Sequence, residues 1–221
     1  MRAAVYWAPE AADPLHALGS TWLGRDAETG ATCVQPDGLA EITADPRGYG
    51  LHATLKPPFH LAQSWFALRD AVAGLAARMP AFALPPLAVR DLKGFLALRE
   101  AAPCPALHAL ADACVAELDA HRAAPSEAEL ERRRRAKLSA RQEAHLQAWG
   151  YPYVFEDWQF HVTLTHRLND AERAAIMPRA IAHFEAVAAT PRLVTELCLF
   201  TQAAPGAPFL IAERFALKGL A

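Results

Sequence analysis

Hydrophobic positions follow two different periods along the 221-residue chain, and each period predicts one kind of element. Runs of apolar, β-branched and aromatic residues predict strands. Runs whose apolar positions recur every three or four residues, after a Ser, Asn or Asp, predict helices. Strands are expected over 2–8, 49–61, 82–90, 94–99, 151–166, 192–201 and 208–217, and helices over 14–24, 64–78, 105–122, 126–149 and 170–188.

The order strand, helix, strand, strand occurs twice, over residues 50–99 and 158–217. Such a duplication predicts two similar halves. We therefore expect an α+β fold with two pseudo-symmetric lobes, in which antiparallel sheets flanked by helices surround a central groove. The chain would be a single bilobal domain, with a first repeat over 1–104, a helical insert over 105–149, a second repeat over 150–221, and terminal strands free to cross between the lobes.

The charge balance narrows the range of partners. The chain has 22 Lys and Arg against 24 Asp and Glu, a formal net charge of −2. Proteins that bind long nucleic acids usually have a strongly basic domain, so long nucleic acid is not the expected partner. The N-terminal apolar run ends at Pro9, and no run approaches the roughly 18 apolar residues of a membrane helix. We expect a cytoplasmic protein without membrane contacts; the oligomeric state stays open.

The tetrapeptide His-x-Thr-Leu occurs once in each half, beginning at His52 and at His161. Both copies fall on a predicted strand. Residues i and i+2 of a strand share a face and lie about 6.6 Å apart. His52 therefore shares a face with Thr54, and His161 with Thr163, while the residues between them face the core. Two halves related by a pseudo-two-fold axis would bring both pairs into one groove.

Two imidazoles and two hydroxyls in one groove suit the cleavage of a phosphodiester. One neutral imidazole can take a proton from water, and an imidazolium opposite can give a proton to the leaving alkoxide. The hydroxyls can donate hydrogen bonds to the phosphate oxygens on which charge builds up. We predict His52, Thr54, His161 and Thr163 as the catalytic residues of a reaction that needs no cofactor and no metal. Which histidine is the acid and which the base stays open.

The paired motifs on a duplicated plan resemble the 2H phosphoesterase superfamily. Its pattern is His, a hydrophobic residue, Thr or Ser, and a hydrophobic residue, occurring twice. The longer strings HATLKPPFHL and WGYPYVFEDWQFHVTLTHRL look like a bacterial branch described as phosphonate-metabolism proteins. The resemblance implies a phosphoric diester hydrolase that opens a small sugar or nucleotide cyclic phosphate. In that branch the implied substrate is 5-phosphoribosyl 1,2-cyclic phosphate, a product of the carbon–phosphorus lyase pathway.

Two other functions stay open at this point. An RNA 2′,3′-cyclic phosphodiesterase or a 2′–5′ RNA ligase-like enzyme would carry the same motifs, although the net charge of −2 favours a small ligand over long RNA. A non-catalytic module that binds nucleotides or RNA belongs to another class. Two intact motifs weigh against it, because simple binding does not need both imidazoles.

Five further residues are candidates for substrate binding. Lys56 lies two residues beyond Thr54 on the same predicted face and could hold a phosphate as a point charge, or could be a surface lysine. Tyr6 and Tyr153 offer hydroxyls to a phosphate or sugar. Arg133 and Arg134 belong to the concentrated basic helix, which is either a solvated face or a source of guanidiniums for a second phosphate.

The remaining histidines and cysteines do not predict a metal site. His60 and His166 lie near the motifs, but neither has an acidic ligand beside it or a chelating spacing. They are interpreted as polar residues at strand ends. The four cysteines are widely spaced and form no C-x-x-C pair, which disfavours a zinc site. We expect them to be reduced core residues.

Overall fold

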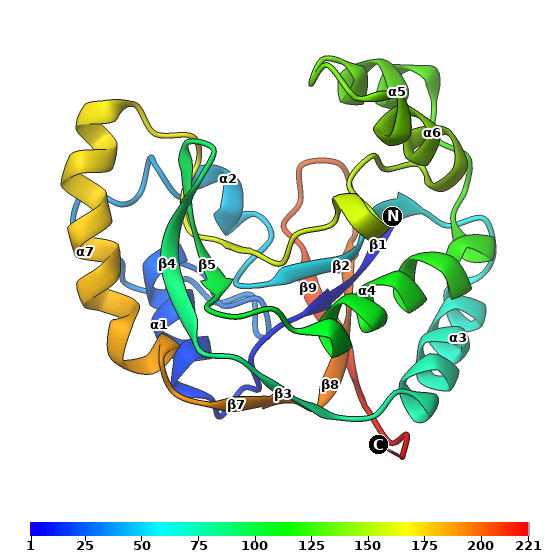
Figure 1. Cartoon of the computed structure of the whole chain (residues 1–221), viewed down its shortest axis with the longest axis horizontal. Coiled ribbons are helices and arrows are strands. Elements are labelled where there is room, and N and C mark those ends of the chain that lie inside the picture. Colours follow the sequence, from blue (N-terminus) through cyan, green and yellow to red (C-terminus); the bar gives the residue numbers. More distant parts are fainter. Residues whose placement is uncertain (221) are drawn as a thin grey trace.

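A seven-stranded antiparallel sheet runs through the computed structural model, which describes residues 1–220 (Figure 1). In order across the sheet its strands are β4 (Leu87–Leu92), β5 (Phe95–Glu100), β6 (Val162–Thr163), β2 (Ala53–His60), β1 (Arg2–Trp7), β8 (Glu196–Gln202) and β9 (Leu210–Ala216). Two short strands, β3 (Phe82–Leu84) and β7 (Arg192–Val194), pair separately with each other. The expected α+β class with antiparallel strands flanked by helices is confirmed.

The helices also follow the duplicated plan. Their bounds are α1 (Pro14–Leu23), α2 (Ala44–Arg47), α3 (Trp65–Arg78), α4 (Pro105–Glu117), α5 (Glu127–Arg134), α6 (Ala140–Trp149) and α7 (Asp170–Ala188), with short 3-10 turns at Asp119–His121 and Phe155–Asp157. The order β2-α3-β3-β4-β5 is thus repeated as β6-α7-β7-β8-β9. The motif strand β6 pairs with β5 of the other repeat, so the two halves exchange strands and share one sheet.

The main hydrophobic core lies between one face of this sheet and four helices. α1, α3, α4 and α7 supply core residues such as Leu15, Leu68 and Phe184. Figure 1 shows α1 and α7 at one end of the sheet and α3 and α4 at the other. Period-2 alternation sends Val5 of β1 into this core and Tyr6 to a smaller cluster on the opposite face. No helix within residues 1–220 has the length and hydropathy to span a bilayer.

The predicted helix over 126–149 is wrong as a single element, because it divides into α5 and α6. Ser139 accepts a hydrogen bond from the Gln142 amide, and the Gln142 side chain reaches back to the Ser139 amide, which makes a capping box that starts α6. Before it, Lys137 has a φ of 54°, in the left-handed region that ends a helix. α5 buries none of its residues, and the two helices stand away from the sheet (Figure 1).

The predicted strand over 151–166 is also wrong except at β6. Phe155 has a φ of 51° and begins a 3-10 turn that interrupts the extended backbone. The Trp158 indole N–H then donates to the Thr54 carbonyl of β2 at 2.8 Å. The Trp158 side chain therefore takes the place of the backbone N–H that a longer β6 would offer to the Thr54 carbonyl. The segment before β6 does not need to pair with β2 and can line the open face of the sheet.

Candidate functional site

The two His-x-Thr motifs lie on neighbouring antiparallel strands, β2 and β6. Their middle residues, Ala53 and Val162, pair directly and face the core. Extending this register by one residue puts the His of each motif opposite the Thr of the other, on the sheet face that the four core helices leave uncovered. His52 and His161 are then diagonal neighbours on adjacent strands, and residues in that relation lie about 7–8 Å apart. The structure thus brings all four predicted catalytic residues together.

Each imidazole is held by an equivalent hydrogen bond to the backbone. Nδ1 of His52 donates to the Gly50 carbonyl at 2.9 Å, and Nδ1 of His161 donates to the Gln159 carbonyl at 2.8 Å. A carbonyl oxygen can only accept, so the proton of each neutral ring lies on Nδ1. Nε2 of each ring keeps its lone pair and can act as a base or, once protonated, as an acid.

Burial keeps both imidazoles uncharged at neutral pH. It lowers the pKa of His52 to about 4; the hydrogen bond to Gly50 opposes this shift and the nearby His161 adds to it. Burial also lowers the pKa of His161, against the hydrogen bond to Gln159. One of the two rings must therefore gain a proton when an anionic ligand binds, if it is to serve as a general acid.

A cavity of about 460 Å³ opens beside His52 and Thr163. The His52 ring lies close to two tyrosines, with ring centroids 4.1 Å from Tyr6 and 5.7 Å from Tyr49. Tyr6 was expected at the groove, and the structure places it in the cavity wall. These rings restrict the orientation of the imidazole and remove water from one side of it, which accounts for the desolvation of His52.

A second cavity of about 380 Å³ lies beside His161. Tyr153, the other predicted tyrosine, lines this cavity together with Tyr151 and Trp158. Thr54 lines both cavities and so lies where they meet. The paired motifs therefore lie between one cavity on the His52 side and a second cavity, lined by both aromatic and charged residues, on the His161 side.

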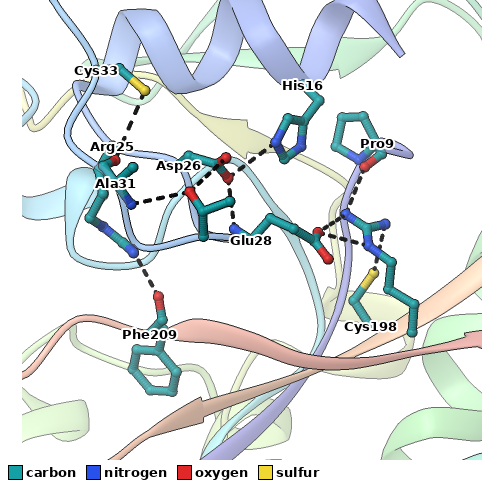
Figure 2. A network of polar contacts seen from close by, with 11 residues as sticks. Pro9, His16, Arg25, Asp26, Glu28, Ala31, Cys33, Cys198 and Phe209 are labelled. Carbon is teal, nitrogen blue, oxygen red and sulfur yellow. Dashed lines mark hydrogen bonds and ion pairs between the residues drawn. The ribbon is translucent and has the colours of Figure 1, made fainter. Parts of the chain in front are cut away.

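A polar network outside the groove supports the wall behind His52 (Figure 2). The Arg25 guanidinium donates to the Phe209 carbonyl at 2.9 Å. The Phe209 ring stacks on Tyr49 at 5.2 Å between centroids. Glu28 in the same loop pairs with Arg214 of β9 at 2.7 Å. These contacts tie the loop after α1 to the edge of the sheet and hold Tyr49 against the imidazole.

Lys56 does not share the face of Thr54, so its predicted placement is wrong. A β-bulge in β2 sets an additional residue, Leu55, against β1 and reverses the alternation of side chains beyond it. Lys56 is only 2% exposed and points to the other face of the sheet. Its ammonium donates there to a carbonyl of α4 and to the Asp119 carboxylate at 3.1 Å. Lys56 therefore joins β2 to α4 and does not line the groove.

The basic helix α5 contributes Arg133 to the site but not Arg134. The Arg133 guanidinium lies over the Tyr151 ring, 4.6 Å from its centroid, and lines the His52 cavity together with Arg132. Arg134 forms ion pairs with two glutamates of the α5–α6 hairpin, so its predicted placement is wrong. Consecutive helical residues point about 100° apart, which separates these neighbours.

The residues of the His52 cavity that were not predicted as site residues include Arg2, Tyr49, Arg132, Tyr151, His166 and Arg167. Arg2 could have been predicted from the sequence, because the alternation of side chains along the first strand puts it on the same face as Tyr6. Tyr49 and Tyr151 had been assigned to predicted strands, but in the structure they lie outside regular elements. His166 was interpreted as a strand-end residue, yet its Nε2 is buried in the wall without a hydrogen-bond partner among residues 1–220.

Within the described part of the chain, no three His, Cys, Asp or Glu side chains are arranged to hold a metal ion. All four cysteines are free. Cys104, Cys114 and Cys198 are buried as expected, whereas Cys33 is half-buried in a loop. Burial raises the pKa of Cys198 to about 12, so this thiol is not a nucleophile at neutral pH.

The fold and its site define a duplicated α+β protein with two His-x-Thr motifs on the open face of one sheet. The chain belongs to the family described as "Protein of unknown function (DUF1045)", whose model matches residues 54–210.

Two curated relatives are named "Ribose 1,5-bisphosphate phosphokinase PhnN". The one from Janthinobacterium sp. (strain Marseille) is 39% identical over 231 residues, covering 99% of this chain and 51% of that protein. The one from Laribacter hongkongensis (strain HLHK9) is 40% identical over 219 residues, covering 96% and 51%. The chain therefore spans about half the length of these relatives.

The chain is also similar to solved structures at low identity. One is E. coli LigT complexed with 3′-AMP, with 16% identity, a TM-score of 0.48, and coverage of 98% of this chain and 97% of that one. Another is TT0787 of Thermus thermophilus, with 16% identity, a TM-score of 0.48 and full coverage of both chains, 100% and 100%.

Proposed function

We propose that this protein is a phosphoric diester hydrolase of the 2H phosphoesterase type, which opens a small cyclic phosphate by acid–base catalysis between His52 and His161. The observation that carries the proposal is the matched pair of imidazoles. Both rings bond through Nδ1 to a carbonyl two residues earlier, and neither Nε2 forms a hydrogen bond within residues 1–220. A module that only binds a ligand does not need two rings held in the same tautomer on adjacent strands.

In the proposed reaction, one neutral Nε2 takes a proton from water, and the water oxygen forms a bond to phosphorus. The bond between phosphorus and the ring oxygen of the substrate breaks, and the other imidazolium gives its Nε2 proton to that oxygen. Thr54 and Thr163 donate hydrogen bonds to the two non-bridging oxygens as charge builds up on them. The product is a phosphomonoester; the histidine that acted as the base has gained a proton from water, and the histidine that acted as the acid has lost its proton to the leaving oxygen. The groups of the chain supply each of these steps without a metal ion or other cofactor.

The substrate that the comparisons favour is 5-phosphoribosyl 1,2-cyclic phosphate. The curated relatives are named for an enzyme of ribose 1,5-bisphosphate, which is also a ribose with phosphates at C1 and C5. The strings around both motifs resemble phosphonate-metabolism proteins as well. The phosphokinase activity in those names is not transferred here, because this chain spans about half of those proteins.

An RNA end with a 2′,3′-cyclic phosphate is the second candidate substrate. The cavity beside His161 supports it, because its lining includes Tyr151, Tyr153 and Trp158, and nucleobases stack on aromatic rings.

The test compares both substrates with chelator-treated protein. The protein is incubated with 5-phosphoribosyl 1,2-cyclic phosphate, or with a short oligoribonucleotide that ends in a 2′,3′-cyclic phosphate, and ³¹P NMR follows ring opening. We expect turnover of the sugar in the presence of chelator. Turnover of the RNA end alone would make the second candidate correct. Turnover of neither, or only after metal is added, would contradict the proposed function. A His52→Asn preparation controls for contaminating phosphodiesterases.

A further inference from the structure

The cavity beside His52 holds more positive charge than the reaction at the paired motifs needs. Four arginines line it, against one carboxylate: Arg2, Arg132, Arg133 and Arg167 against Asp45. None of the four arginines forms an ion pair with a carboxylate in residues 1–220. Arg2 donates instead to the Gln202 amide oxygen, and Arg167 to a backbone carbonyl. Guanidinium charge therefore remains uncompensated at the wall of this cavity.

Three phenol hydroxyls share this space with the guanidiniums. Burial raises the pKa of Tyr6 well above its ordinary value; Tyr49 and Tyr151 act in the same direction, and Arg2 and Arg133 oppose it. Burial also raises the pKa of Tyr151, so the hydroxyls of Tyr6 and Tyr151 remain protonated at neutral pH and can donate hydrogen bonds. Tyr6 is 1% exposed, and no hydrogen bond joins its hydroxyl to another residue of the described chain.

The position of these donors relative to the reacting centre follows from the sheet. Tyr6 on β1 pairs with Thr54 on β2, so its side chain lies one strand away from the Thr54 side chain, on the same face. Strands in a sheet are about 4.8 Å apart. A group held by Tyr6 and its neighbours would thus lie within the length of a small sugar from a phosphate held at the motifs.

The Arg133 side chain is not placed there by hydrophobic packing, because α5 buries none of its residues. Its guanidinium instead stacks over the Tyr151 ring and lines the cavity. The planar fork of an arginine matches two oxygens of a phosphate, and stacking on a ring orients that fork before a ligand arrives.

We propose that Arg2, Arg133, Tyr6 and Tyr151 form a second anion subsite, which binds a phosphomonoester group of the substrate while the cyclic phosphate reacts at the paired motifs. The inference rests on the proposed function and adds to it. It restricts the substrate to a small sugar phosphate that carries a cyclic phosphate and, at its other end, a terminal phosphate. An unphosphorylated sugar cyclic phosphate would leave this subsite without its anion.

The test measures kcat/KM for 5-phosphoribosyl 1,2-cyclic phosphate and for ribose 1,2-cyclic phosphate, which lacks the terminal phosphate. The wild-type protein should prefer the former at least a hundredfold. Arg133→Gln should lower this ratio at least tenfold. Arg134→Gln, on the same helix but paired with glutamates outside the cavity, is the matched control and should leave the ratio unchanged. Equal ratios in the wild type and Arg133→Gln would overturn the proposal.

A binding measurement separates failure of the subsite from failure of the proposed function. Isothermal titration calorimetry follows ribose 5-phosphate, which has the terminal phosphate but no reactive ring phosphate. Affinity that falls at least tenfold in Arg133→Gln, and not in Arg134→Gln, supports the subsite even if no cyclic phosphate is turned over. Turnover together with binding that is unaffected by Arg133→Gln would leave the proposed function standing and overturn the subsite.

Discussion

Binding of an anion at the paired motifs should be coupled to uptake of a proton by the imidazoles. Burial lowers the pKa of His52 to about 4, so about 0.1% of these side chains are charged at pH 7. For half of them to carry a proton at that pH, a bound ligand has to favour the imidazolium by about 4 kcal/mol.

A phosphate or sulfate group can supply an interaction of this size. Two unit charges about 4 Å apart interact by about 4 kcal/mol at an effective dielectric constant of about 20. A divalent anion offers about twice the charge, and its own desolvation removes part of the gain. We therefore expect uptake of between about half a proton and one proton per site at pH 7.

Sulfate is a suitable probe because it does not itself titrate near neutral pH. Calorimetric titrations at pH 7 in buffers of different ionisation enthalpy measure the protons taken up. The sign follows from the pKa, which the anion raises: binding is favoured as the pH falls, so sulfate affinity should decrease as pH rises from about 6 to about 8. If sulfate binds but its observed binding enthalpy does not depend on the buffer, no proton is taken up, and the coupling between anion binding and proton uptake is refuted. His52→Asn should bind sulfate with less proton uptake.

Three substitutions check other parts of the account. Thr163→Val removes a donor to the phosphate and should lower kcat by about 10²–10³ with little change in KM; a loss below tenfold would contradict that role. Lys56→Met should keep kcat/KM within about threefold, because the side chain faces α4, whereas the urea midpoint should fall, since the substitution removes one partner of a buried ion pair and leaves Asp119 without the ammonium; a large loss of activity with intact folding would place Lys56 in the groove. Trp158→Phe removes the N–H that donates to the Thr54 carbonyl and should cost about 1 kcal/mol in urea unfolding; an unchanged midpoint would contradict this.

The faces of the motif strands could be predicted from the sequence because local alternation decides them. His52 and Thr54 lie on the strand before the bulge, where period 2 holds. The prediction failed at Lys56, two residues further on, because a bulge is set by the register with the partner strand. Nothing in the string Thr-Leu-Lys-Pro-Pro states which residue of β1 lies opposite Leu55.

The lining of the groove was less predictable than its catalytic pairs. Arg133 and Arg134 are adjacent in one basic run, and only the placement of α5 decides which of them meets the cavity. The break before α6 did have a signal, since Ser139 and Gln142 have the spacing of a capping box. Tyr49 and Tyr151 were assigned to predicted strands but lie outside regular elements in the structure, so their convergence on His52 depends on the tertiary fold.

The most direct test of paired acid–base catalysis is kcat/KM for the cyclic phosphate in His52→Asn, His161→Asn and the double variant. Asparagine can still donate to the carbonyl that each Nδ1 meets, but it cannot transfer a proton. Each single variant should lose about 10²–10⁴ in kcat/KM, and the double variant should lose far less than the product of the two losses. Retention of activity within tenfold by either single variant would contradict catalysis by the pair.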